Sequence, residues 1–188
     1  MKDYKHPIRI IIEKMILAIF GLLILETFFI QPFRIPSGSM MPSLQIGDLI
    51  LVNRFHYWIH PPKREDVVVF QSRENPRNIF VKRIIGEGGE TIQIKDYRIY
   101  INGIPLIESY IKGPTYDTGA LRYPKIIPYN QYVVLGDNRN DSYDSRYFGP
   151  VQYDSIKGKA FLIFWYERNR RGQLIWWPWW QWNRTIVL

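Results

Sequence analysis

The sequence predicts a mainly β protein, in which an N-terminal transmembrane helix precedes an all-β, largely antiparallel domain. Three observations predict it. One long apolar segment lies near the N-terminus, and no stretch after residue 36 shows the period of a long helix. Short apolar runs instead alternate with turns rich in Gly, Pro and Asn. With 188 residues, 46% of them hydrophobic, the chain can form one domain and a short extra element.

The N-terminal segment, residues 10–30, reads IIIEKMILAIFGLLILETFFI and could cross about 30 Å of hydrocarbon as a helix. Basic residues precede its apolar run. The positive-inside rule therefore puts residues 1–9 in the cytoplasm and everything after residue 30 on the outer face. A cleavable signal peptide is the alternative. However, the bulky ETFFIQPFR after the apolar run offers no small-x-small cleavage site, so an uncleaved anchor is favoured.

Residues 31–167 are expected to form the β-rich domain. Apolar runs bounded by turn residues predict strands over 48–55, 66–72, 78–86, 131–137 and 158–167. Residues 91–108 alternate apolar and polar residues, and their Asn102-Gly103 pair predicts a type I′ hairpin turn. Residues 109–130 are typical of a loop.

The tail, residues 168–188, has five tryptophans between positions 176 and 182, just after the basic RNRRG. It predicts either a final strand or an aromatic patch on the core, or else an interfacial anchor with Trp at headgroup depth and Arg facing anionic lipid. The anchor is favoured. The net charge of +8 suits nucleic acid or an anionic membrane surface, and the seven tryptophans of the chain favour the membrane.

Several nucleophile chemistries are excluded or poorly supported. The chain has no Cys, which excludes a thiol nucleophile, disulfides and Cys-ligated metals. Of its three His, His6 falls on the predicted cytoplasmic side. His56 and His60 begin and end the HYWIH segment, which is followed by two prolines. These two are interpreted as surface or packing residues. A Ser-His-Asp triad is therefore poorly supported.

A serine can also be activated by a neutral lysine, and burial lowers the pKa of a lysine. In FVKRII, strand alternation puts Phe80, Lys82 and Ile84 on one face. Lys82 is therefore a candidate general base, and the alternative is that its side chain extends from an edge strand into water. A further segment, GDNRNDSYDSRYFG at 136–149, is dense in charged and hydroxyl residues. It is consistent with an ion-pair-rich turn or a calcium loop. It lacks EF-hand ligand spacing, and no metal is expected.

Three segments together resemble conserved boxes of bacterial type I signal peptidases, in the order of that family and behind its N-terminal anchor. They are IPSGSMMPSLQIGDLILVNRF (35–55), FVKRIIG (80–86) and GDNRNDSYDSRYFG (136–149). The resemblance implies a membrane-anchored serine endopeptidase that removes N-terminal signal peptides. It would cut after small residues of the A-x-A type and need no cofactor. Glu65 departs from the family, which usually has Gly there.

The resemblance implies a role for each matching residue. Ser39 would be the nucleophile and Lys82 the general base. Ser37 and the backbone N–H of Ser39 would form the oxyanion hole. The hydroxyl of Ser142 would position the Lys82 amine.

The remaining site predictions concern support of this dyad and substrate binding. Asp144 would hold the third box in shape by pairing with Arg146 or Arg83. Five residues are candidates for lining the shallow substrate pocket: Ile35, Met40, Leu44, Phe80 and Tyr143.

The resemblance also implies partners and a location. The partners would be precursor proteins bearing signal peptides, membrane lipids and the protein-export machinery, with no nucleic acid. The location would be a bacterial-type plasma membrane or a thylakoid membrane, with the catalytic domain on its outer face. Two alternatives stay open: another Ser-Lys processing peptidase, and a non-catalytic membrane-anchored β-domain that binds anionic surfaces.

Overall fold

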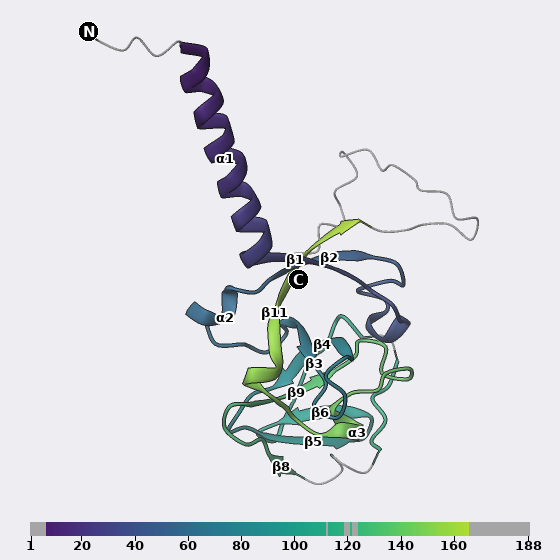
Figure 1. Cartoon of the computed structure of the whole chain (residues 1–188). Coiled ribbons are helices and arrows are strands. Elements are labelled where there is room, and N and C mark those ends of the chain that lie inside the picture. Colours follow the sequence, from purple (N-terminus) through teal and green to yellow (C-terminus); the bar gives the residue numbers. More distant parts are fainter. Residues whose placement is uncertain (1–6, 112, 119–120, 122–123, 166–188) are drawn as a thin grey trace, which may run out of the picture.

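Two antiparallel β-sheets form the body of the protein, and one long helix extends away from it (Figure 1). The computed structural model describes residues 7–111, 113–118, 121 and 124–165. The tail predicted over 168–188 and residues 1–6 of the predicted cytoplasmic segment lie outside the described residues. The prediction of a mainly β, antiparallel domain is confirmed.

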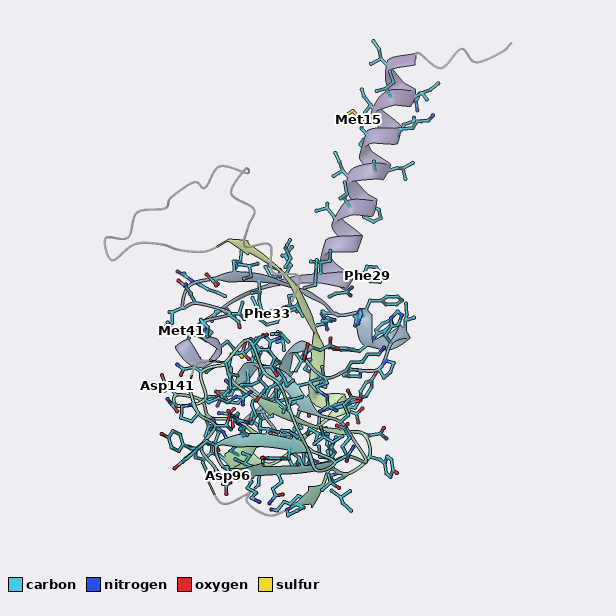
Figure 2. The ribbon with its side chains drawn as sticks, turned by 180° about the vertical axis from the view of Figure 1, so that it is seen from behind. Met15, Phe29, Phe33, Met41, Asp96 and Asp141 are labelled. Carbon is cyan, nitrogen blue, oxygen red and sulfur yellow. The ribbon has the colours of Figure 1, made fainter. Side chains whose placement is uncertain are left out.

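The helix α1 (Pro7–Phe29) carries exposed apolar side chains between residues 8 and 23 (Figure 2). Pro7 occupies its first position, where the missing backbone N–H is not needed. Met15 is 58% exposed and Leu17 is 69% exposed. Judged by length and apolarity, no helix within the described residues qualifies to cross a membrane. The transmembrane anchor predicted over residues 10–30 is therefore not confirmed.

The larger sheet has seven strands in the order β1-β2-β11-β3-β4-β9-β10. Its strands are β1 (Ile30–Arg34), β2 (Leu49–Asn53), β3 (Val67–Gln71), β4 (Ile79–Gly86), β9 (Gln131–Leu135), β10 (Val151–Gln152) and β11 (Ile156–Trp165). Five of them match predicted strands. The edge strands β1 and β10 were not predicted, because β1 contains Pro32 and β10 is only two residues long. An edge position tolerates proline, which cannot donate a ladder hydrogen bond.

The smaller sheet has four strands in the order β7-β6-β5-β8. Its strands are β5 (Thr91–Lys95), β6 (Arg98–Ile101), β7 (Ile104–Pro105) and β8 (Lys125–Ile126). The predicted turn at Asn102-Gly103 is confirmed, with φ of 51° and 80° as a type I′ turn requires. A second turn of the same kind, at Asp96-Tyr97 with φ of 49° and 61°, was not predicted, because Tyr rarely adopts positive φ.

Four short helical segments also escaped prediction, since three or four residues are too few to show a helical period. They are η1 (Gly38–Met40), α2 (His56–Ile59), α3 (Ser145–Phe148) and η2 (Tyr153–Ser155), where η denotes a 3-10 turn.

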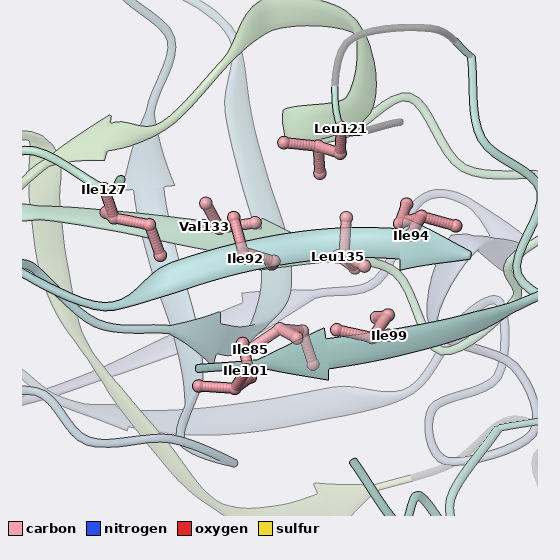
Figure 3. Close-up of a cluster of buried hydrophobic side chains, with 9 residues drawn as sticks. All are labelled: Ile85, Ile92, Ile94, Ile99, Ile101, Leu121, Ile127, Val133 and Leu135. Atoms are coloured by element: carbon pink, nitrogen blue, oxygen red, sulfur yellow. The ribbon is translucent and has the colours of Figure 1, made fainter. Parts of the chain in front are cut away.

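The core explains why the strands at the centre read as continuous apolar runs. Along β3, Val67 and Val69 pack into one apolar cluster, and Val68 and Phe70 pack into another on the opposite face. A strand buried on both faces needs apolar residues at every position. A third cluster joins the two sheets, with side chains from β4 and β9 meeting those of β5 and β6 (Figure 3). Packing in these clusters holds β4, the strand that carries Lys82, in its position in the sheet.

Candidate active site

Ser39 lies in the 3-10 turn η1, between β1 and β2. The turn is closed by the Met41 N–H, which donates to the Gly38 carbonyl at 3.0 Å. It is anchored by Met40, whose side chain is 1% exposed within the apolar cluster that includes Val67 and Val69. Ser39 itself is only half-buried. The turn therefore holds the Ser39 hydroxyl at the edge of the core, where a substrate can reach it.

Lys82 reaches this hydroxyl from the centre of the large sheet. Its Nζ lies 2.6 Å from Ser39 Oγ, a hydrogen-bond distance, although 43 positions separate the two residues. Lys82 is 3% exposed, and its Nζ lies 5.9 Å from the centroid of the Phe80 ring. Burial lowers the pKa of Lys82 to about 8, while the charges of Asp144 and Asp137 oppose the shift. The amine is thus set to be neutral at mildly basic pH.

Ser37, the residue directly before η1, lies beside the same hydroxyl. Its side chain is exposed, and its Oγ donates to Ser39 Oγ at 3.4 Å. A serine hydroxyl rotates freely about its Cβ–Oγ bond, so this donor can turn toward a neighbouring negative charge. The structure therefore brings Ser37, Ser39 and Lys82 together.

The third box packs directly against η1. A Cβ atom built on Gly136 would lie 2.4 Å from the Ser39 carbonyl oxygen and 2.3 Å from Ser142 Oγ, so only glycine fits. Met41, which follows η1, and Asp141, which lies within the third box, are on the same side of the domain in Figure 2. Ser142 Oγ is buried and has no hydrogen-bond partner among the described residues. Its predicted contact with the Lys82 amine is not formed here, and its positioning role stays a prediction.

Two buried ion pairs hold the third box and β4 in place. Asp144 pairs with Arg146, with distances of 2.8 Å to Nε and 2.9 Å to Nη2, and also accepts from the Gly136 N–H at 3.1 Å. Of the two partners proposed for Asp144, the structure therefore gives Arg146. Arg83 instead pairs with Asp137, at 2.9 Å and 2.7 Å. Whether these pairs support catalysis stays a prediction.

The five candidate pocket residues fall into two groups. Ile35, Met40 and Leu44 are buried together in one apolar cluster. Phe80 is half-buried, and its ring lies 6.4 Å from that of Tyr143, which is 49% exposed. All five lie in or next to the segments that carry Ser39, Lys82 and Ser142. Their role in substrate binding stays a prediction.

Sequence reasoning missed contacts made by polar residues of the third box. Asn138 donates from its backbone N–H to the Ser39 carbonyl at 3.0 Å and from Nδ2 to the Gly38 carbonyl at 3.1 Å. Arg139, which is 1% exposed, binds Glu108 and the hydroxyl of Thr115. The dense run of charged and amide residues in 136–149 was a signal that some side chains there turn inward to pair with one another. The sequence contains no signal that pairs them with residues far away in the chain.

Known proteins of one family are similar to this chain. Residues 8–165 match the family described as signal peptidase, peptidase S26. A signal peptidase I of Leptolyngbya laminosa is 42% identical, over 80% of this chain and 75% of the relative. A probable signal peptidase I-2 of Synechocystis is 38% identical, over 81% and 71%. The chloroplastic thylakoidal processing peptidase 1 of Arabidopsis thaliana is 31% identical, over 72% of this chain and 42% of the relative. The chain belongs to peptidase family S26, the signal peptidases, and is a hydrolase of the serine endopeptidase class.

Proposed function

We propose that this protein removes N-terminal signal peptides from exported precursors, with Ser39 as nucleophile and Lys82 as general base. One observation carries the proposal: Lys82 Nζ lies 2.6 Å from Ser39 Oγ while its side chain is buried. A lysine can accept a proton only when neutral, and burial lowers its pKa to about 8. The curated relatives named signal peptidase I support the choice of substrate.

The first half of the reaction acylates Ser39. The neutral Lys82 amine takes the proton of Ser39 Oγ as this oxygen forms a bond to the scissile carbonyl carbon. The carbonyl oxygen becomes an oxyanion, which accepts hydrogen bonds from the Ser37 hydroxyl and the Ser39 N–H. The Lys82 ammonium then gives its proton to the leaving nitrogen as the carbon–nitrogen bond breaks. The mature protein leaves with a free amino terminus.

The second half releases the signal peptide. Lys82, neutral again, takes a proton from water as the water oxygen attacks the Ser39 ester. The same oxyanion donors stabilise the second tetrahedral intermediate. Its collapse breaks the bond to Ser39 Oγ, which recovers its proton from Lys82. Lys82 thus takes up and gives back the proton in each half of the proposed reaction.

Specificity for small residues would come from shallow apolar pockets beside Ser39. Ile35, Met40 and Leu44 are packed in a core cluster and leave little room to move apart. A large substrate side chain would therefore clash, whereas alanine would fit. Phe80 and Tyr143 would border the site near Lys82. Such pockets would favour cleavage after A-x-A sequences.

Attachment to a membrane is the second part of the proposal. The exposed apolar side chains of α1 favour burial in lipid over exposure to water. Lys2, Lys5 and Arg9 would keep the N-terminus in the cytoplasm and the β-sheets on the outer face. The membrane would be a plasma membrane or, as for the thylakoidal relative, a thylakoid membrane. Lipids would then be partners of α1.

The absence of cysteine from the chain makes this topology directly testable. Single cysteines at Asp3 and at the exposed Ser109 would be labelled in intact cells with a membrane-impermeant maleimide. Labelling of Ser109→Cys alone is expected, with Asp3→Cys reacting only after lysis. Equal labelling of both, or recovery of the protein in the soluble fraction, would contradict the proposed anchor.

The activity itself is tested with the full-length protein in detergent or lipid and a precursor that carries an A-x-A site. Wild type should cut directly after that site, and Ser39→Ala and Lys82→Met should not. An unaffected Lys82→Met variant would remove Lys82 from the mechanism. A folded wild type that leaves several precursors intact would exclude signal peptide removal.

A further inference from the structure

Asn138 holds both peptide groups that flank Ser39. Its side-chain Nδ2 donates to the Gly38 carbonyl at 3.1 Å. Its backbone N–H donates to the Ser39 carbonyl at 3.0 Å. One residue of the third box thus fixes the peptide before the nucleophile and the peptide after it. Neither contact involves the Ser39 hydroxyl or Lys82, so Asn138 is separate from the proton transfer.

The first of these contacts acts on the proposed oxyanion donor. The Gly38 carbonyl and the Ser39 N–H belong to the same planar peptide group and point in opposite directions. Fixing the carbonyl oxygen therefore fixes the direction of the N–H. A carbonyl that accepts hydrogen bonds also polarises its peptide group, which makes the N–H a stronger donor. The Gly38 carbonyl accepts a second bond, from the Met41 N–H at 3.0 Å, on the same peptide.

We propose that Asn138 is a positioning residue for catalysis, which orients and polarises the Ser39 N–H so that it stabilises the tetrahedral oxyanion. This inference rests on the proposed function, because it assumes that the Ser39 N–H is an oxyanion donor. It assigns to the third box a second task besides holding the region around Lys82. The asparagine amide suits this task because it supplies a donor to Gly38 without placing a charge near the Lys82 amine.

The test is a kinetic comparison of full-length Asn138→Ala with wild type and with Asn140→Ala. Asn140 is exposed in the same loop and serves as the matched control. Loss of a whole oxyanion donor lowers kcat by about 10² to 10³. Since Asn138→Ala removes only the support of one donor, kcat should fall about 10- to 100-fold. KM should stay within about twofold, and Asn140→Ala should match wild type.

Two further readouts separate positioning from a merely structural role. The pH at which activity is half-maximal should not move in Asn138→Ala, because no charge near Lys82 has changed. The combination with Ser37→Ala should deviate from the product of the two single effects by more than about threefold, because both changes act on one oxyanion. A structural role predicts instead a kcat loss that follows the loss of folded protein and multiplies independently with Ser37→Ala.

Failure of this inference is distinct from failure of the proposed function. If wild type cleaves, Ser39→Ala is inactive and Asn138→Ala keeps kcat within twofold of wild type, the positioning role is overturned and the proposed function stands. Should Asn138→Ala not fold, Asn138→Leu keeps the branched shape and the backbone contact, adds no charge and loses the Nδ2 donor. Measured on the basic plateau of its pH profile, it should show the same fall in kcat, and full activity would overturn the inference.

Discussion

The Nζ of Lys82 lies 2.6 Å from the Oγ of Ser39, between two segments that are 43 positions apart in the chain. Lys82 comes from the centre of the large sheet, and Ser39 comes from a tight turn at the edge of the core. The apolar packing around β4 removes water from the amine and lowers its pKa to about 8. The same packing therefore both places the Lys82 amine beside Ser39 and lowers its pKa.

The first prediction concerns the pH dependence of cleavage. In the proposed mechanism only neutral Lys82 accepts the Ser39 proton, and its neutral fraction rises as pH rises through its pKa of about 8. The logarithm of kcat/KM should therefore increase by about one per pH unit below pH 8 and level off above it. A peptide assay from pH 5 to 10 measures this directly. A profile that is flat between pH 6 and 9 would contradict a lysine base with a lowered pKa.

The second prediction is that Lys82→Met abolishes cleavage and stabilises the fold. Lowering the pKa of Lys82 from its ordinary value of 10.5 to about 8 corresponds to a cost of about 3 kcal/mol in the folded protein at neutral pH. Methionine has no charge to desolvate, but it loses the contact with Ser39. The net gain should therefore be about 1–3 kcal/mol, or several degrees in Tm.

The pH dependence of this gain has a definite sign. Below pH 8 lysine is protonated in the unfolded chain and the cost of burying it is fully present in the folded protein. Between pH 8 and 10.5 the folded protein holds Lys82 neutral while the unfolded chain is still losing its proton, so the cost disappears. The Tm difference between Lys82→Met and wild type should be largest below pH 8 and shrink toward pH 10.5. Lower stability of Lys82→Met at pH 7 would show that burial of the amine is not the dominant cost.

Prediction from the sequence succeeded where local pattern determines structure. Apolar runs bounded by turn residues predicted five strands of the large sheet, and Asn102-Gly103 gave the correct turn. It failed where the partner lies far away in the chain. Asp137 binds Arg83, 54 positions away, and Asn138 binds Gly38, 100 positions away. Such pairs depend on which strands become neighbours, and no local pattern encodes that.

The candidate site was predicted by resemblance more than by pattern. Residue chemistry alone left Lys82 open between a buried base and an edge-strand side chain. The order of the three boxes favoured the interpretation of Lys82 as a buried base. The structure adds burial and distance, which sequence cannot supply, and it leaves Ser142 without the predicted contact to Lys82.

The third prediction compares two glycines of the site. A Cβ at Gly136 would meet the Ser39 carbonyl at 2.4 Å, and backbone atoms cannot move aside cheaply. A Cβ at Gly38 would come closest to the flexible end of the Met41 side chain, at 3.1 Å. Gly136→Ala should therefore lower kcat/KM at least tenfold more than Gly38→Ala does. Equal activity of the two variants in the peptide assay would show that η1 and the third box can separate without affecting catalysis.

The fourth prediction uses the departure from the family pattern at Glu65. Its φ of 73° lies in the left-handed region, which costs a non-glycine residue roughly 1–2 kcal/mol. Its N–H donates to the Ile84 carbonyl at 2.8 Å and its carbonyl accepts from Arg83 at 2.9 Å, so the backbone is held in this conformation. Glycine would keep both contacts and remove the strain, at the cost of greater freedom in the unfolded chain. Glu65→Gly should therefore raise the free energy of unfolding by about 0.5–1 kcal/mol.

Thermal or urea unfolding of the full-length protein in detergent measures this difference. Glu74→Gly is the matched control, because Glu74 is exposed in a loop and its φ is not positive. That control should be neutral or slightly destabilising, since glycine there only adds freedom to the unfolded chain. If Glu65→Gly is destabilising by as much as the control, the left-handed conformation at Glu65 carries no strain that glycine can relieve. Activity should be unchanged in both variants, because neither side chain contacts Ser39 or Lys82.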